Sequence, residues 1–104
     1  MNYDSFFILH NRCSFAISIS SIKMKTEIQY RKAIGGALLD IRNSLSEDGI
    51  KVTQDDVAFQ AGISTRYYGA IERGEVMPTI FILAKIAEAL QMPLHKLCEL
   101  IENY

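Results

Sequence analysis

Hydrophobic residues recur three and four positions apart through most of the chain after Met24, and this spacing predicts α-helices rather than strands. The first predicted helix begins at Thr26 and ends at the polar stretch "SEDG". Thr26 and Gln29, three positions later, have the pattern of a capping box, in which each satisfies a backbone N–H of the other. The predicted inner face of this helix consists of Tyr30, Ile34, Ala37, Leu38, Ile41 and Leu45.

Four shorter helices are predicted downstream. Each begins at a capping or helix-opening residue, namely Thr53, Ser64, Thr79 (after Pro78) and Pro93. Gly62 and Gly74 end the second and third helices, because glycine readily adopts the left-handed backbone that stops a helix. Helices this short are unstable alone in water, so their apolar faces must pack together. The pattern therefore predicts an all-α bundle of five helices.

The first 23 residues differ from the rest, because they are rich in Phe, Ile and Ser. Residues 14–20 alternate apolar and serine positions, which is typical of a strand, so a β-arm that pairs with a partner subunit is one interpretation. A loosely ordered tail and a true start of translation at Met24 are the others. Asp4 stands where a signal peptide would carry positive charge, and the polar residues 10–12 interrupt the apolar run, so we expect neither a signal peptide nor a membrane span. We expect an N-terminal extension over 1–23 and one domain over 24–104.

Composition restricts the possible functions. The chain has 104 residues, 49% of them hydrophobic, which suits one small core. Its net charge of −1 means that any basic surface must be local. Cys13 and Cys98 fit no zinc spacing or disulfide framework, so a reducing cytoplasm is expected. His95 and Cys98 on one helix are too few for a metal site, and no nucleophile has an adjacent base. We expect no catalytic residue, metal or cofactor.

The second and third helices, "TQDDVAFQA" and "STRYYGAIER", are joined only by Gly62 and Ile63. Two helices linked by so short a turn cross steeply, which requires a small residue at their closest approach and a residue that tolerates positive φ in the turn. Ala58 and Gly62 meet these requirements. Ile63, Tyr68 and Ile71 would fill the angle between the helices. The pair is predicted to form a helix-turn-helix.

Several motifs occur in a fixed order between Ile34 and Leu100: "IG", "TQDDVA", "GIS", "IERG", a proline four residues on, and "LAKIAEALQMPLHKL". In this order they resemble the lambda-repressor-like, Cro-type helix-turn-helix (XRE) family. The resemblance implies a lambda-repressor-like bundle that binds double-stranded DNA as a sequence-specific transcription regulator, here expected to be a repressor. It also implies a homodimer, because two-fold dimers read two half-sites. Ile101 and Tyr104 on the last helix are candidate dimer contacts, and the alternative is that they close the core.

Six residues are candidate DNA contacts, four of them by resemblance to the family and two, Tyr67 and Arg73, from their expected orientation or charge. The resemblance places the third helix in the major groove with its first turn, Ser64, Thr65 and Arg66, at the base edges. The Arg66 guanidinium suits the O6 and N7 atoms of guanine. Tyr67 is expected to face outward toward a phosphate or sugar. Gln54 resembles the phosphate-contacting glutamine of the family, and Arg73 is a candidate cation, with Lys51, Lys25, Arg31 and Lys32 as further candidates.

Three other positions in these helices carry predictions. The family pairs an arginine of the first helix with the glutamate of "IERG", which here implies a largely buried ion pair between Arg42 and Glu72. Tyr68 should face the core, where its hydroxyl needs a partner. Gly69 stands in mid-helix at a cost of about 1 kcal/mol relative to alanine. We expect that its missing side chain lets the helix approach DNA more closely.

Two departures from the family pattern reduce the positive charge expected near DNA. Glu75, Val76 and Met77 follow "ERG", and the stretch "NSLSEDGIKV" is a long acidic insertion. From Met24 onward nine Lys and Arg face eleven Asp and Glu, which weakens non-specific attraction to phosphates. The alternative hypothesis is a protein–protein interaction module, such as an antitoxin or co-regulator. It would use the apolar surface of the fourth and fifth helices or the N-terminal arm.

Overall fold

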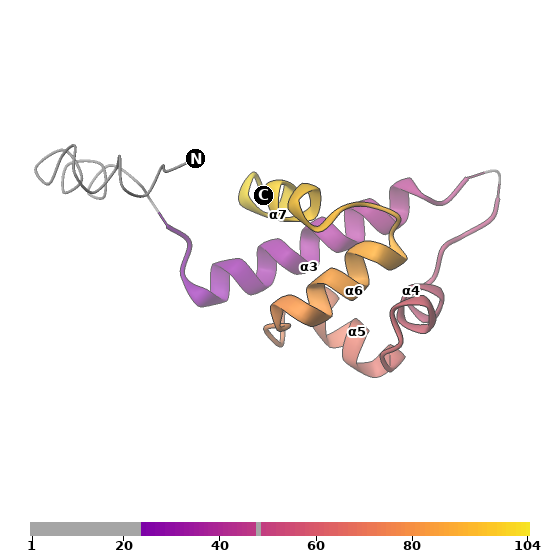
Figure 1. Cartoon of the computed structure of the whole chain (residues 1–104), viewed down its shortest axis with the longest axis horizontal. Coiled ribbons are helices and arrows are strands. Elements are labelled where there is room, and N and C mark those ends of the chain that lie inside the picture. Colours follow the sequence, from indigo (N-terminus) through magenta and orange to yellow (C-terminus); the bar gives the residue numbers. More distant parts are fainter. Residues whose placement is uncertain (1–23, 48) are drawn as a thin grey trace, which may run out of the picture.

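The computed structural model describes residues 24–47 and 49–104, and these residues form five helices (Figure 1). They are α3 (Glu27–Ser44), α4 (Gln54–Ala61), α5 (Thr65–Glu72), α6 (Ile80–Ala89) and α7 (Leu94–Glu102). The described part of the chain contains no strand beyond an isolated bridge between Glu47 and Ile50. The predicted all-α, five-helix fold is therefore confirmed. The hypotheses on residues 1–23 concern a segment outside the described residues.

Helix starts are fixed by local side-chain caps. Thr26 Oγ1 accepts from the Gln29 backbone N–H at 3.1 Å, and Gln29 Oε1 accepts from the Thr26 N–H at 2.8 Å. Thr53 and Asp56 form the same reciprocal pair at the start of α4. These contacts satisfy N–H groups that would otherwise have no helical partner. Single hydroxyl caps serve α5 and α6, from Ser64 and Thr79.

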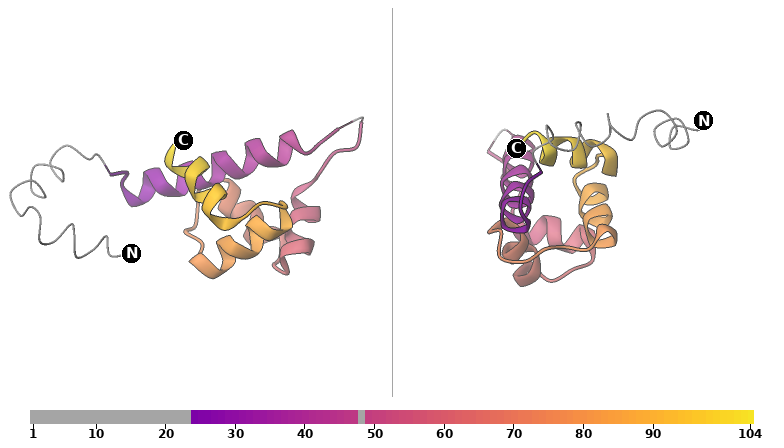
Figure 2. Two further views of the ribbon diagram at one scale, coloured as in Figure 1. Left: turned by 45° about the horizontal axis from the view of Figure 1, so that its top comes forward. Right: turned by 90° about the vertical axis from the view of Figure 1, so that its left-hand side faces the viewer.

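The helices surround one apolar core. The right-hand view of Figure 2 shows α3, α7 and α6 along three sides of the bundle, with the α4–α5 pair closing the fourth. Helix α3 packs against α5 and α7, while α6 packs against α4 and α7. The buried apolar residues are Ala33, Ile34, Ala37, Leu38, Val57, Ala58, Ala61, Tyr68, Ile71, Leu83, Ile86, Ala87, Leu90, Leu97 and Ile101.

The last helix corrects one prediction. Ile101 was a candidate dimer contact, but it is 5% exposed and belongs to the core, so that role is wrong. It lies four positions after the buried Leu97, on the face of α7 that packs into the bundle. Tyr104 remains 57% exposed and donates a hydrogen bond to Asp40 Oδ2 at 2.8 Å. Leu45, predicted on the inner face of α3, is 42% exposed where that helix ends.

A close approach between α3 and α5 depends on Gly35. A Cβ atom at this position would lie 2.9 Å from the Glu72 carbonyl carbon and 2.9 Å from the Ile71 carbonyl oxygen, and closer still to the Glu72 oxygen. Because these atoms are backbone, they cannot move aside without separating the two helices. Gly35 therefore sets the distance at which α3 meets the end of α5.

Among the described residues, no helix is both long and apolar enough to span a membrane.

Candidate nucleic-acid interface

The turn between α4 and α5 has the geometry that the sequence predicts. Gly62 adopts φ +73° and ψ +29°, which is left-handed backbone. The Ile63 N–H donates to the Ala58 carbonyl at 3.0 Å, and Ala58 itself is 1% exposed. This turn redirects the chain so that α5 begins at the surface while Tyr68 and Ile71 enter the core. The described structure therefore contains a helix-turn-helix whose second helix starts in solvent.

The first turn of α5 presents three exposed residues. Ser64 caps the helix by accepting from the Tyr67 N–H at 3.1 Å. Thr65 Oγ1 donates to Asp55 Oδ1 and so ties the start of α5 to the start of α4. Arg66 is exposed and has no hydrogen-bond or ion-pair partner among the described residues. Of the three, Arg66 has the side chain that is free to reach a ligand.

The prediction that Tyr68 faces the core and Tyr67 faces outward holds only in part. Tyr68 is 0% exposed and lies in the core. Burial, reinforced by the nearby Glu72 carboxylate, raises the pKa of Tyr68 far above its ordinary value. Its hydroxyl nevertheless has no hydrogen bond of acceptable geometry within the described structure. Tyr67 is half-buried and packs against the edge of the core, so it lies less freely in solvent than expected.

Arg42 and Glu72 form a buried, two-pronged ion pair. Arg42 Nε donates to Glu72 Oε2 at 2.8 Å and Nη2 donates to Oε1 at 2.9 Å, with side chains 9% and 4% exposed. Arg42 Nη1 also donates to the Val52 carbonyl at 2.9 Å. Burial alone would raise the pKa of Glu72, but hydrogen bonds from Arg42 and Gln54 outweigh it and lower the pKa. The pair joins α3, the loop before α4, and the end of α5.

Gln54 lies in an environment that the sequence pattern did not indicate. Its side-chain Nε2 donates to Glu72 Oε1 at 2.9 Å, and the residue is half-buried. The first residue of α4 is thereby joined to the last residue of α5. Nothing in the local spacing of the sequence signals this contact, because it depends on how the two helices cross.

Arg73, the other candidate cation of this surface, is paired with Glu75. Nε donates to Oε2 at 2.9 Å and Nη2 donates to Oε1 at 3.2 Å, with both side chains 55% exposed. The hydrogen bonds from Arg73 lower the pKa of Glu75, so the carboxylate stays charged beside the guanidinium. This contact reduces the positive charge that Arg73 offers to DNA, as expected from the acidic Glu75 directly after "ERG". In the sequence, the opposite charges of Arg73 and Glu75, two positions apart, are the feature that could have indicated this ion pair.

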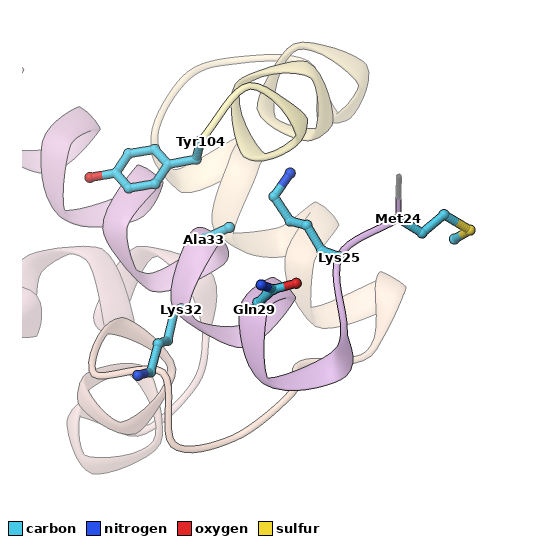
Figure 3. A pocket seen from close by; sticks show the side chains of 6 residues that line it. All are labelled: Met24, Lys25, Gln29, Lys32, Ala33 and Tyr104. Atoms are coloured by element: carbon cyan, nitrogen blue, oxygen red, sulfur yellow. The ribbon is translucent and has the colours of Figure 1, made fainter. Parts of the chain in front are cut away.

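The remaining candidate cations belong to neither α4 nor α5. Lys25 donates to the Glu102 carbonyl at 2.8 Å and lies over the Tyr30 ring. A surface pocket of about 660 Å³ adjoins this end of α3 and is shown in Figure 3. Lys32 points away from Tyr104 in that view. The pocket is lined by Met24, Lys25, Gln29, Lys32, Ala33 and Tyr104, none of which belongs to α4 or α5.

Comparison with known proteins agrees with this geometry. Residues 50–97 match the family model HTH_3, helix-turn-helix. The restriction-modification controller protein C.AhdI from Aeromonas hydrophila is 27% identical, with a TM-score of 0.57 over 64% of this chain and 94% of that one. The clp gene regulator ClgR from C. glutamicum is 26% identical, with a TM-score of 0.62 over 71% and 90%. An HTH_3 family transcriptional regulator from Vibrio cholerae is 32% identical, with a TM-score of 0.62 over 71% and 39%. No curated protein sequence matched.

Proposed function

The chain carries a helix-turn-helix domain of the HTH_3 (XRE-type) family, and from this premise we propose that it is a sequence-specific DNA-binding repressor of transcription. The observation that carries the proposal is Arg66 in the first turn of α5, which is exposed and has no partner among residues 24–47 and 49–104. The similarity to transcription regulators such as ClgR supports the same conclusion.

In the proposed complex, α5 lies in the major groove with Ser64, Thr65 and Arg66 at the base edges. Arg66 donates two hydrogen bonds to the O6 and N7 atoms of a guanine, a contact worth about 1–3 kcal/mol of discrimination against another base. Thr65 is held by Asp55, which fixes the angle at which α5 leaves α4. Base recognition therefore rests mainly on one long, free side chain.

Contacts to the DNA backbone are assigned to Gln54, Tyr67 and Arg73. The N-terminal end of α4 also offers backbone N–H groups, and a helix N-terminus attracts phosphates. Because Glu75 partly neutralises Arg73, few cations are left to displace counterions from DNA. The logarithm of the affinity should then fall only shallowly with the logarithm of salt concentration, with a slope of about −0.9 for each phosphate neutralised.

We further propose that the active form is a homodimer. A two-fold dimer reads two half-sites about 34–36 Å apart, so its binding site is palindromic. Such a dimer bound across a promoter occupies the groove that other proteins need, which is the simplest basis for repression. Sedimentation of the free protein and of its DNA complex measures this directly.

A second candidate function is supported by the exposed apolar residues at the start of α6. Met77, Ile80 and Phe81 are 39%, 66% and 66% exposed within five consecutive positions. Exposed apolar clusters mark protein-interaction sites more often than isolated exposed residues do. A co-regulator or antitoxin that binds another protein through this surface would need no contact with DNA.

The two functions are separated by selecting bound sequences from a random duplex pool with the full chain. We expect a palindromic site to be enriched, and the Arg66→Ala variant to lose the preference for guanine at one position of each half-site. Lys96→Ala is the matched control, because Lys96 is an exposed, paired cation on α7. Absence of enrichment at low salt would refute the repressor and favour the interaction module.

A further inference from the structure

Gly69 lies in the middle of α5, where glycine destabilises a helix relative to alanine. It shares one side of the helix with Arg66, three positions before it, and Arg73, four positions after it. Those two arginines are exposed, yet Gly69 is buried. Some other part of the chain must therefore cover this position.

The cover comes from Gln54 and Arg73. A Cβ atom at residue 69 would lie 3.0 Å from Arg73 Nη1, 3.2 Å from Gln54 Oε1 and 3.8 Å from Gln54 Cδ. The first two separations are tighter than nine in ten real Cβ contacts, so each of these side chains would have to shift by a few tenths of an ångström. Gln54 thus crosses α5 over the gap at Gly69 and reaches Glu72 with its Nε2 atom.

From these contacts we infer that Gly69 is a positioning residue that seats Gln54 and Arg73, rather than a point of close contact between α5 and DNA. Gln54 is anchored through Nε2 to the buried Glu72, and its Oε1 lies over Gly69. Arg73 binds Glu75 through Nε and Nη2, which leaves Nη1 against the same gap. The absence of a side chain at residue 69 brings both groups together on the face that carries Arg66.

The DNA part of this inference rests on the proposed function, whereas the seating of Gln54 does not. With alanine at residue 69, Gln54 Oε1 and Arg73 Nη1 must each move away from the new Cβ by a few tenths of an ångström, which changes how Gln54 lies between Gly69 and Glu72. Gln54 and Arg73, two of the three residues assigned to the DNA backbone, are then displaced together. Alanine at residue 69 should consequently weaken DNA binding only while Gln54 and Arg73 are present.

The test uses the full chain in four forms: wild type, Gly69→Ala, the double variant Gln54→Ala/Arg73→Ala, and the triple variant. Without DNA, the ¹H–¹⁵N resonances of the Gln54 side-chain amide should shift in Gly69→Ala. With a labelled duplex of random sequence at low salt, Gly69→Ala should weaken binding at least about threefold in the wild-type background. In the Gln54→Ala/Arg73→Ala background it should change binding by less than about twofold. Gly36→Ala is the control, because Gly36 is also a helical glycine, covered instead by the Tyr104 ring.

Each outcome decides the matter. An equal loss of binding in both backgrounds would overturn the inference and indicate that DNA itself approaches Gly69. Unchanged Gln54 resonances in Gly69→Ala would overturn it as well. If the wild-type chain binds no duplex at low salt, the proposed function fails, and the amide spectra alone then support or overturn the seating of Gln54.

Discussion

Replacing Arg42 with alanine should destabilise the domain far more than replacing Arg73, although each arginine binds a glutamate through nearly the same distance. The Nε–Oε2 separations are 2.8 Å for Arg42–Glu72 and 2.9 Å for Arg73–Glu75. The pairs differ in burial, because the Arg42 and Glu72 side chains are 9% and 4% exposed while both partners of the other pair are 55% exposed. Burial therefore decides the energetic difference.

The magnitudes follow from desolvation. Removing Arg42 leaves the Glu72 carboxylate without its counter-charge in a place that water reaches poorly, and removes a donor from the Val52 carbonyl. Breaking a buried pair in this way costs about 3–5 kcal/mol, whereas an exposed pair contributes about 0.2–1 kcal/mol. A small domain has a total stability of about 5–15 kcal/mol, so Arg42→Ala should remove a large part of it.

The assay is urea unfolding of the full chain followed by circular dichroism. With a slope of about 1.5 kcal/mol per M, Arg42→Ala should lower the urea midpoint by about 2–3 M and Arg73→Ala by less than about 0.7 M. Arg42→Lys should fall between them, because lysine keeps the charge but cannot make the two-pronged contact. Similar midpoints for Arg42→Ala and Arg73→Ala would refute the reasoning.

Three further outcomes concern the same part of the bundle. Gly35→Ala should lower the unfolding free energy by about 1–3 kcal/mol, because the new Cβ meets the backbone of α5. This loss should exceed the gain from the higher helix propensity of alanine, and an unchanged urea midpoint would contradict it. Tyr68→Phe should leave the midpoint unchanged or raise it, since the hydroxyl is buried without a hydrogen bond, and a loss above about 1 kcal/mol would reveal a missed partner. The lowered pKa of Glu72 stabilises the fold above its unfolded pKa of about 4.3, and this contribution disappears as pH falls through the folded value. Acid titration of stability should therefore be shallower for Glu72→Gln than for wild type.

The local features of this protein can be inferred from its amino-acid sequence alone. Thr26, Thr53 and Ser64 cap helices because each hydroxyl reaches an N–H group only a few residues away. Gly62 provides positive φ in the turn because only its own backbone conformation matters there. Apolar spacing likewise placed Tyr68 and Ile71 inside. Such features depend on neighbours along the chain, so the helix-turn-helix could be inferred before any packing was known.

Which polar groups of the candidate interface contact one another depends on how the helices pack. Gln54 reaches Glu72 and lies over Gly69 because α4 and α5 cross at one particular angle and distance. Ile101 is buried because α7 packs against α3 and α6. Periodicity identifies an apolar face but not the element that covers it, and it gives no information on hydrogen bonds between side chains of different helices. These contacts are set by the packing of the whole core, which no local pattern of residues encodes.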